Sequence, residues 1–250
     1  MQQFAQNYPQ LMNQAVAVDL SQEDLSRLRS AFDFCQLLAD GIYRAQGIPL
    51  LNHLVRTASI VLNQTNSVDV VITALLHAAF VVDKFDHSTR TPDLEIKRKD
   101  IRRLFGNEIE HLLLAYEKMA WYQKKALQHY LEVHSSLAQE MKNLLLIRLA
   151  NELEDHLDFA MAYTPPSREA RRSLAYGAEC VSLARALGYG VIADNLNAIL
   201  TEQQAVKIPD QLRTTCSQGY QFNQPLWPMS LLRRARNALA LLARKHLGRR

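Results

Sequence analysis

The sequence predicts an all-α fold of about nine helices. Apolar residues recur every three or four positions along most of the 250 residues, which is the period of helices with one buried face. Glycine and proline number only eight each, and no strand partner or internal repeat is evident. With 48% apolar residues, the chain is expected to form one full-sized core over roughly residues 21–203.

The first two expected helices cover residues 21–40 and 50–63. Ser21 followed by Asp24 is a capping arrangement, and apolar residues follow it at helical spacing. Because the periodic pattern begins there, residues 1–20 are expected to form a separate N-terminal segment.

Residues 68–82 are almost wholly apolar and predict a buried helix. Their β-branched residues would also suit a strand, but Ala74, Leu75 and Leu76 in the middle favour a helix. A loop that contains serine, threonine and proline is expected over residues 83–93.

The helices that follow end at recognisable residues. Gly106 and Gly188 stand where two periodic stretches stop. Pro165 and Pro166 end a long stretch, and Ser167 begins the next one. These helices are expected at residues 96–105, 107–119 with a continuation to about 134, 135–162, 168–187 and 191–203.

The C-terminal part divides into a linker and a basic helix. Residues 204–228 lack periodicity and contain three prolines and a glycine, which indicates a linker or extended arm. Residues 229–250 predict a separate amphipathic helix with leucine and alanine on one face. Its opposite face carries Arg233, Arg234, Arg236, Arg244 and Lys245.

Three roles for this basic helix remain open. An apolar stripe flanked by arginine suits an anionic membrane surface. The leucine face would equally suit docking on the protein's own core. The arginines would also suit an acidic protein partner or a nucleic-acid backbone.

The charge distribution argues against nucleic-acid binding by the whole protein. The net charge is +4, but seven of the 29 Lys and Arg residues lie in residues 229–250, which contain no acid. Residues 1–228 therefore carry 22 basic against 25 acidic residues, and a nucleic-acid-binding body would be basic.

Cysteine usage and the N-terminus predict a cytoplasmic protein, with peripheral membrane contact as the expectation for the basic helix. Cys35, Cys180 and Cys216 are far apart and odd in number, so neither a disulfide framework nor a zinc knuckle is expected. The N-terminus lacks a positive cluster followed by an apolar stretch.

Two histidines stand in informative contexts. His53 lies near the start of one predicted helix, and His77 lies inside the apolar one. Asn151 and Asp155 are four residues apart on another apolar helix, so they share a face. Two histidines and a carboxylate are ingredients of a divalent metal site. The alternative is that the histidines are core residues bonded to backbone carbonyls.

Several short motifs occur here in the order and spacing of the HD-domain hydrolases. Over about residues 20–200, the chain resembles in particular the hydrolase domain of the RelA/SpoT family, which degrades the alarmone (p)ppGpp. The resemblance rests on Arg44, Gly47, Pro49 and His53, on Leu75-Leu76-His77, on Phe105-Gly106, on Leu149-Ala150 and on Leu187-Gly188.

The resemblance also implies changes at the metal ligands. That family holds its metal with two histidines and two aspartates. His53 and His77 match the histidines and are expected as residual ligands only. Ala78 and Asn151 stand at the aspartate positions, so the first shell of ligands loses two negative charges.

The family's water-activating Glu-Asp pair corresponds to Val81 and Val82. A hard cation such as Mn²⁺ requires anionic oxygens, and water activation requires a base. The changes therefore lead us to expect no catalytic residue and no cofactor, although Asp155 or Asp83 could in principle supply a carboxylate.

The expected function is that of a catalytically decayed HD-domain protein, a pseudoenzyme that acts as a binding or scaffold module. The family's arginine stacks on the guanine base, and Arg44 keeps that residue type. The alternative is a divergent phosphohydrolase of a nucleotide such as (p)ppGpp, with Mn²⁺ or another divalent metal. The candidate ligand-binding residues for a nucleotide or other phosphate-bearing molecule are Arg44, His53, His77, Asn151 and Asp155.

Overall fold

A computed structural model describes residues 4–81, 94–121, 123–165, 168–214 and 220–221. Within these ranges, ten α-helices account for nearly all regular structure, which confirms the all-α prediction. The chain divides into two compact units, Met1–Tyr220 and Gln221–Arg250. Of the second unit only Gln221 is described, so the predicted basic helix lies outside the described residues.

The N-terminal residues belong to the core, which begins earlier than the predicted residue 21. Helix α1 (Tyr8–Ala17) starts at Asn7, whose side chain accepts a hydrogen bond from the amide of Gln10. Leu11 and Ala15 on this helix are fully buried. Sequence reasoning missed it because the helix is only ten residues long and precedes the capping arrangement at Ser21.

The next three helices follow the prediction closely. They are α2 (Gln22–Ala39), α3 (Leu50–Leu62) and α4 (Val68–Leu76). The Ser21 side chain caps α2 through the amide of Asp24. The strand alternative for residues 68–82 is wrong, but the helix ends at Leu76 and a turn follows it.

The predicted long helix over residues 135–162 is instead three elements. These are the 3₁₀ turn η1 (His134–Ser136), α8 (Gln139–His156) and the 3₁₀ segment η2 (Leu157–Tyr163). The regular helix ends because Leu157 has an extended ψ of 145°, and Asp158 and Phe159 then adopt left-handed backbone angles, with φ of 56° and 54°. Residues of these types rarely adopt such angles.

The remaining described elements are helices, one 3₁₀ turn and two short strands. Gly106, at φ 95°, separates two helices as predicted. The elements are α5 (Leu94–Phe105), α6 (Asn107–Lys118), α7 (Lys124–Val133), α9 (Arg168–Ala186), α10 (Gly190–Ala205), the 3₁₀ turn η3 (Asp210–Leu212), and the paired two-residue strands β1 (Ile42–Tyr43) and β2 (Tyr220–Gln221).

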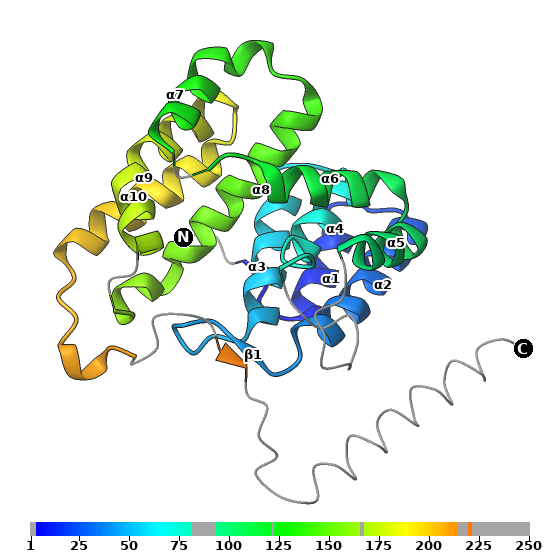
Figure 1. Cartoon of the computed structure of the whole chain (residues 1–250), viewed down its shortest axis with the longest axis horizontal. Helices are drawn as coiled ribbons and strands as arrows, with labels where there is room; N and C mark the ends of the chain where they lie inside the picture. Colours follow the sequence, from blue (N-terminus) through cyan, green and yellow to red (C-terminus); the bar gives the residue numbers. More distant parts are fainter. Residues whose placement is uncertain (1–3, 82–93, 122, 166–167, 215–219, 222–250) are drawn as a thin grey trace, which may run out of the picture. The chain divides into compact units, whose positions relative to one another are not determined.

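Helix α3 lies at the centre of the packing. It contacts α1, α4 and α8, while α4 also packs on α2 and α6, and α8 packs on α9 and α10 (Figure 1). Eleven of the 13 residues of α3 are buried, including several polar ones. Polar residues on such a helix are therefore held inside the protein, where they need partners.

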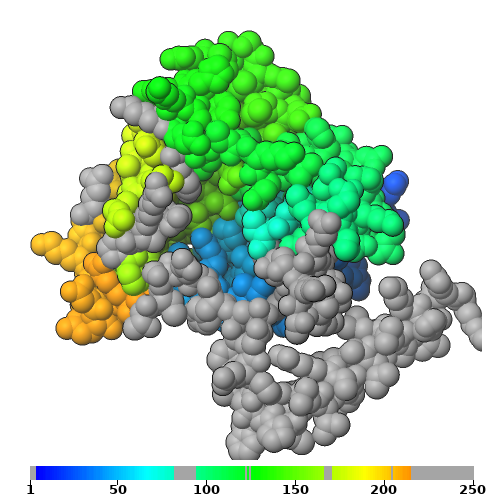
Figure 2. Space-filling view, in the orientation of Figure 1, coloured from blue at the N-terminus to red at the C-terminus, as the bar shows by residue number. Residues whose placement is uncertain are grey.

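One face of the molecule shows where the β1–α3 segment lies beside α8 and α4 (Figure 2). In Figure 2, the blue surface of the β1–α3 segment lies between the green surface of the α8–η2 segment and the cyan surface at the end of α4.

In the part of the chain that the structure describes, no helix combines the length and apolar character needed to span a bilayer.

Candidate functional site

Two histidines face each other where α3 meets the end of α4. His53 lies in the first turn of α3, and His77 is the residue at which α4 ends. Their Nε2 atoms are 3.3 Å apart, and their ring centroids are 5.2 Å apart. The packing of α3 on α4 therefore brings together two residues that are 24 positions apart in the sequence.

Hydrogen bonding assigns the protonation of the His77 ring. His77 Nδ1 lies 2.7 Å from the carbonyl oxygen of Ala74, so in a neutral ring this nitrogen carries the proton and donates it. The lone pair on His77 Nε2 then faces Nε2 of His53. A proton on His53 Nε2 would donate to His77, whereas a proton on His53 Nδ1 would donate to the carboxylate of Glu154.

Both histidines are neutral at pH 7. Burial lowers the pKa of His53 to about 3, and the positive charge of Arg44 acts in the same direction. Burial also lowers the pKa of His77 to about 3, and the neighbouring His53 adds to this effect. Neutral imidazole is the form that binds metals or accepts hydrogen bonds.

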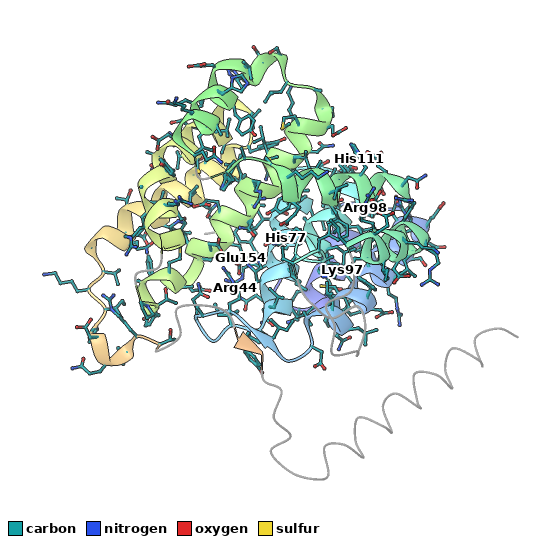
Figure 3. The ribbon with its side chains drawn as sticks, in the orientation of Figure 1. Arg44, His77, Lys97, Arg98, His111 and Glu154 are labelled. Atoms are coloured by element: carbon teal, nitrogen blue, oxygen red, sulfur yellow. The ribbon has the colours of Figure 1, made fainter. Side chains whose placement is uncertain are left out.

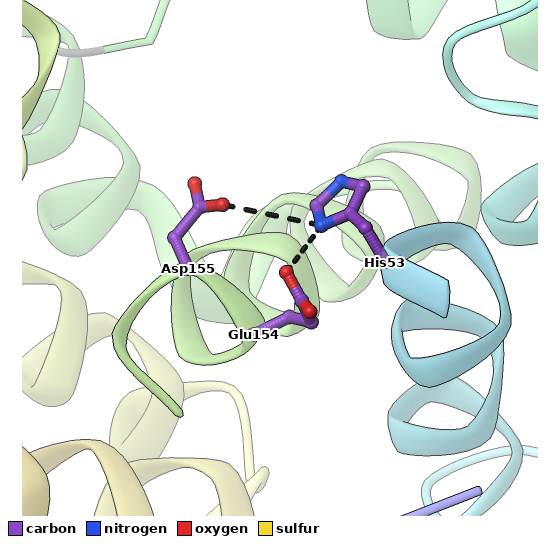
Figure 4. A group of neighbouring side chains, drawn as sticks. All are labelled: His53, Glu154 and Asp155. Atoms are coloured by element: carbon purple, nitrogen blue, oxygen red, sulfur yellow. Dashed lines mark hydrogen bonds and ion pairs between the residues drawn. The ribbon is translucent and has the colours of Figure 1, made fainter. Parts of the chain in front are cut away.

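Helix α8 places two carboxylates on the other side of His53. Figure 4 shows Glu154 and Asp155 both directed at Nδ1 of His53. Glu154 Oε2 contacts this nitrogen directly, and Asp155 Oδ1 lies 4.0 Å from it. The Glu154 side chain is only 2% exposed, and burial raises its pKa. A proton on this carboxyl would be donated to Nδ1 of His53.

Arg44 occupies the space between these groups and neutralises the carboxylates. Its Nη1 lies 3.0 Å from Glu154 Oε2 and 3.0 Å from His53 Nδ1, and its Nη2 donates to Asp155. Figure 3 shows Arg44, Glu154 and His77 converging at the centre of the molecule. The guanidinium therefore provides the positive charge that two nearby acids require.

A tight turn aims Arg44 into the site. The amide of Gly47 donates to the carbonyl of Arg44 at 2.9 Å, and the amide of Arg44 donates to the carbonyl of Ile48 at 2.9 Å. Gly47 has φ of 79°, a left-handed angle that glycine adopts without strain. Pro49 then begins α3. The spacing of Arg44, Gly47 and Pro49 is therefore explained by the backbone conformation that this turn requires.

A second arginine supports the same carboxylate. Arg56, one turn after His53 on α3, lies 4.0 Å from Glu154 Oε1 through its Nη1. The same nitrogen donates to Asp158 Oδ2 at 2.8 Å. Glu154 is consequently held between two guanidinium groups, which compensates the cost of burying its charge.

The structure brings together all five predicted ligand-binding residues. The amide of Asn151 donates to Asp155 Oδ2 at 3.3 Å and bonds to His53, which places it at the histidine pair. Ala78 is buried beside His77, and Val81 is 59% exposed in the following turn. Val82 and Asp83 lie outside the described residues.

Sequence reasoning missed Glu154 and Arg56. It expected uncharged residues at the family's aspartate positions and named Asp155 but not Glu154 as a nearby acid, whereas the site contains the carboxylates of both. A usable signal existed: Arg56 follows His53 by three residues, and Glu154 follows Asn151 by three, so each shares a helix face with a candidate.

The donor set distinguishes between types of metal ion. Two imidazole nitrogens that bind one Zn²⁺ at about 2.0–2.1 Å with a tetrahedral angle lie roughly 3.3 Å apart, which matches the histidine pair. A hard ion such as Mn²⁺ needs carboxylate oxygens, but Arg44 already binds both carboxylates. The residues present do not fit a hard ion such as Mn²⁺.

The comparison with protein families decides the classification. The family described as "HD domain" matches residues 31–170, more than half of the chain. The chain belongs to the HD-domain family. This match covers the HD-domain histidine pair, the Arg44 turn and the acids of α8, and the all-α architecture agrees with it.

One solved structure similar to this HD-domain chain is a metazoan ortholog of SpoT, described as hydrolysing ppGpp and acting in starvation responses. The two share 16% sequence identity, with a TM-score of 0.48, over 72% of this chain and 97% of the other. No curated protein matches this chain.

Proposed function

We propose that this HD-domain protein is a non-catalytic binding or scaffold module for a nucleotide or other small phosphate-bearing molecule. The observation that carries the proposal is the position of Arg44, whose guanidinium forms ion pairs with both Glu154 and Asp155 beside the histidine pair. An internal cation replaces the charge that a metal would supply, so the site is stable without one.

The loss of the family's acids supports the same proposal. Ala78 follows His77, and Asn151 stands on α8 beside His53. A methyl group and a neutral amide contribute no negative charge to a metal. Glu154 stands against the opposite ring nitrogen of His53 from the one that faces His77, so it does not restore the missing ligand.

Arg44 also supports a ligand with a planar ring. Its side chain is 21% exposed, and its hydrogen bonds to Glu154, Asp155 and His53 hold the guanidinium plane in one orientation. A fixed guanidinium plane is a stacking surface for a base, and Asn151 offers an amide beside it. The binding residues proposed are Arg44, His53, His77, Asn151 and Asp155.

Metal and activity measurements separate this proposal from the alternative of a divergent phosphohydrolase. The protein is purified in Mn²⁺, its metal content is measured by elemental analysis, and phosphate release is followed with (p)ppGpp and nucleoside monophosphates. We expect no stoichiometric manganese and no phosphate release. A bound stoichiometric ion together with turnover would establish the hydrolase instead.

Ligand binding is tested by calorimetry with the nucleotides GDP and ppGpp. Arg44→Lys keeps the charge that Glu154 needs but removes the planar face, so we expect affinity to fall about tenfold. Arg29→Lys changes an exposed arginine whose partner is Asp33 on the same helix, and it is the matched control. Equal affinities of the wild type and both variants would refute a role for Arg44.

The C-terminal basic helix remains part of the proposal as a membrane contact. Its cations would meet anionic headgroups at about 1 kcal/mol each. Flotation with phosphatidylserine-containing vesicles is expected for the full chain and not for a chain that lacks residues 229–250. Equal flotation of both forms would exclude this contact, and docking on the protein's own core or binding to an acidic partner or nucleic-acid backbone would then remain as roles.

A further inference from the structure

A cavity separate from the histidine pair opens where α1, α3 and η2 meet. Its volume is about 650 Å³, which lies in the range of small-molecule sites. Phe4, Leu157, Arg56 and Asp158 are among the residues that line it. We call this cavity the α1 groove.

The α1 groove has an unusual lining of side-chain amides. Gln10 and Asn13 from α1 and Asn63 from the end of α3 all line it. Gln10 and Asn13 are exposed. A carboxamide both donates and accepts hydrogen bonds, as a sugar hydroxyl does, so the lining suits a molecule rich in hydroxyl groups.

Buried contacts fix the walls of the groove. The amide of Ala5 donates to Ser59 Oγ at 2.8 Å, and Ser59 Oγ donates to Gln14 Oε1 at 2.6 Å. Gln14 Nε2 in turn donates to Asn63 Oδ1 at 2.7 Å. These bonds join α1 to α3, so the amides are carried by packed elements.

Arg56 contributes a positive charge to the α1 groove, and its ion-pair partner Asp158 can be displaced. Arg56 is buried, whereas the Asp158 side chain that it binds at 2.8 Å is 72% exposed. An ion pair with such an exposed member contributes little stability. A phosphate can take the place of this carboxylate, because the guanidinium fork matches its oxygens.

The backbone at Asp158 is strained. Asp158 and Phe159 both have left-handed angles, and Phe159 is held in place by packing against the core. Two consecutive non-glycine residues with left-handed backbone angles are uncommon. Backbone strain of this type is found most often at ligand sites and switch regions. Release of Asp158 from Arg56 would let this residue leave the wall of the groove.

We propose that the α1 groove binds a sugar phosphate, with the phosphate on Arg56 in exchange for Asp158 and the hydroxyls on the amides of α1. This site is independent of the proposed nucleotide site, because none of the five residues assigned there lines the groove. Arg56 also lies 4.0 Å from the buried Glu154, so the two sites share a charged neighbour.

Two isosteric variants test the proposal from opposite directions. Asp158→Asn removes the competing charge, and asparagine tolerates the left-handed angle, so affinity for glucose 6-phosphate should rise roughly three- to tenfold. Asn13→Asp adds a negative charge to the exposed rim and should lower it by a similar factor. Gln36→Glu, an exposed position on α2 outside the lining, is the charge-matched control for Asn13→Asp.

Titrations are followed by ¹H–¹⁵N NMR, with glucose 6-phosphate, inorganic phosphate and glucose as probes. Support requires shifts of the α1 and η2 amides, with glucose 6-phosphate binding more tightly than either other probe. Equal affinity for inorganic phosphate would overturn the role of the amides, and equal affinity for glucose would overturn that of Arg56. No shift in α1 or η2 at about 10 mM glucose 6-phosphate, even in the Asp158→Asn protein, would overturn the site.

Discussion

Arg44 contacts three polar groups at once: it binds Glu154 and Asp155 and lies 3.0 Å from a ring nitrogen of His53. Removing one partner of a buried ion pair leaves an uncompensated charge. We expect Arg44→Ala to lower the free energy of unfolding by about 2–4 kcal/mol at pH 7, measured by urea denaturation.

The control for Arg44 is Arg29→Ala, since Arg29 pairs with Asp33 at 3.8 Å on an exposed helix face. Arg29→Ala should lower the free energy of unfolding by only about 0–1 kcal/mol. The double variant Arg44→Ala, Glu154→Gln should recover part of the stability because it removes the unpaired carboxylate. Equal losses for Arg44→Ala and Arg29→Ala would contradict the assigned role.

The two buried histidines predict acid sensitivity. An unfolded histidine takes up a proton near pH 6.5, whereas folded His53 and His77 do so only near pH 3. The unfolded state therefore binds more protons between these values, and stability is complete above pH 6.5 and is lost as the pH falls. Each histidine should contribute a loss of roughly 1–2 kcal/mol between pH 7 and 5.

His77→Gln should remove one of these contributions, so the difference in stability between pH 7 and pH 5 becomes smaller. His111→Gln, at an exposed position, should leave that difference close to the wild-type value. Urea denaturation at both pH values measures it, and an unchanged pH dependence in His77→Gln would show that this ring is not held neutral.

At the scale of single residues, the sequence identified which residues form the site better than it identified the contacts between them. His53, His77, Arg44 and Asn151 were recognised because they stand at motif positions. Glu154 was not, because an acid in a charged stretch of helix looks the same whether it is solvated or buried. Its burial depends on α3 packing against α8, which is a long-range contact.

At the scale of elements, the turn before α3 determines where Arg44 points. Gly47 has φ of 79°, and an added Cβ would meet no atom within 4 Å. Any loss of stability in Gly47→Ala therefore reflects backbone conformation. We expect the free energy of unfolding to fall by about 1–2 kcal/mol. Calorimetry should also show weaker nucleotide binding, since the turn positions the guanidinium.

The matched control is Gly190→Ala. Gly190 is also free of neighbours within 4 Å of an added Cβ, but it has no left-handed angle and begins α10. Alanine there should be neutral or stabilise by up to about 1 kcal/mol. Comparable destabilisation by both variants in thermal melts would contradict the explanation by backbone angle.

Element ends were harder to predict than element centres. Glycines marked the ends of α5 and α9 correctly, because Gly106 and Gly188 adopt left-handed backbone angles that stop a helix. The end of α8 at His156 carries no such mark, since the chain leaves the helix at Leu157 and then takes left-handed angles at Asp158 and Phe159. None of these three residues is a glycine or a proline.

At the scale of the whole molecule, α1 completes the core around α3. Leu11 is fully buried and Val16 on the same helix is 58% exposed. We expect Leu11→Ala to cost about 2–4 kcal/mol and Val16→Ala less than about 0.5 kcal/mol. Deletion of residues 1–20 should cost more than Leu11→Ala in the same denaturation experiment, and equal effects of the two point variants would contradict the packing of α1.

The fold class and the family were predictable from the sequence, because helical periodicity and motif order extend over most of the chain. The α1 groove was not, since its amides come from two segments about 50 residues apart and carry no motif. Individually they resemble ordinary surface residues, and only packing of α1 on α3 places them together.

The 3.3 Å spacing of the two imidazole nitrogens also has a practical consequence for the laboratory. A neutral histidine pair of this kind is a chelator for nickel and zinc, the ions that leach from affinity resins and glassware. Preparations made on nickel columns would acquire a contaminant at this position and imitate a metalloenzyme. Tag-free purification with a chelating wash is therefore the appropriate starting material.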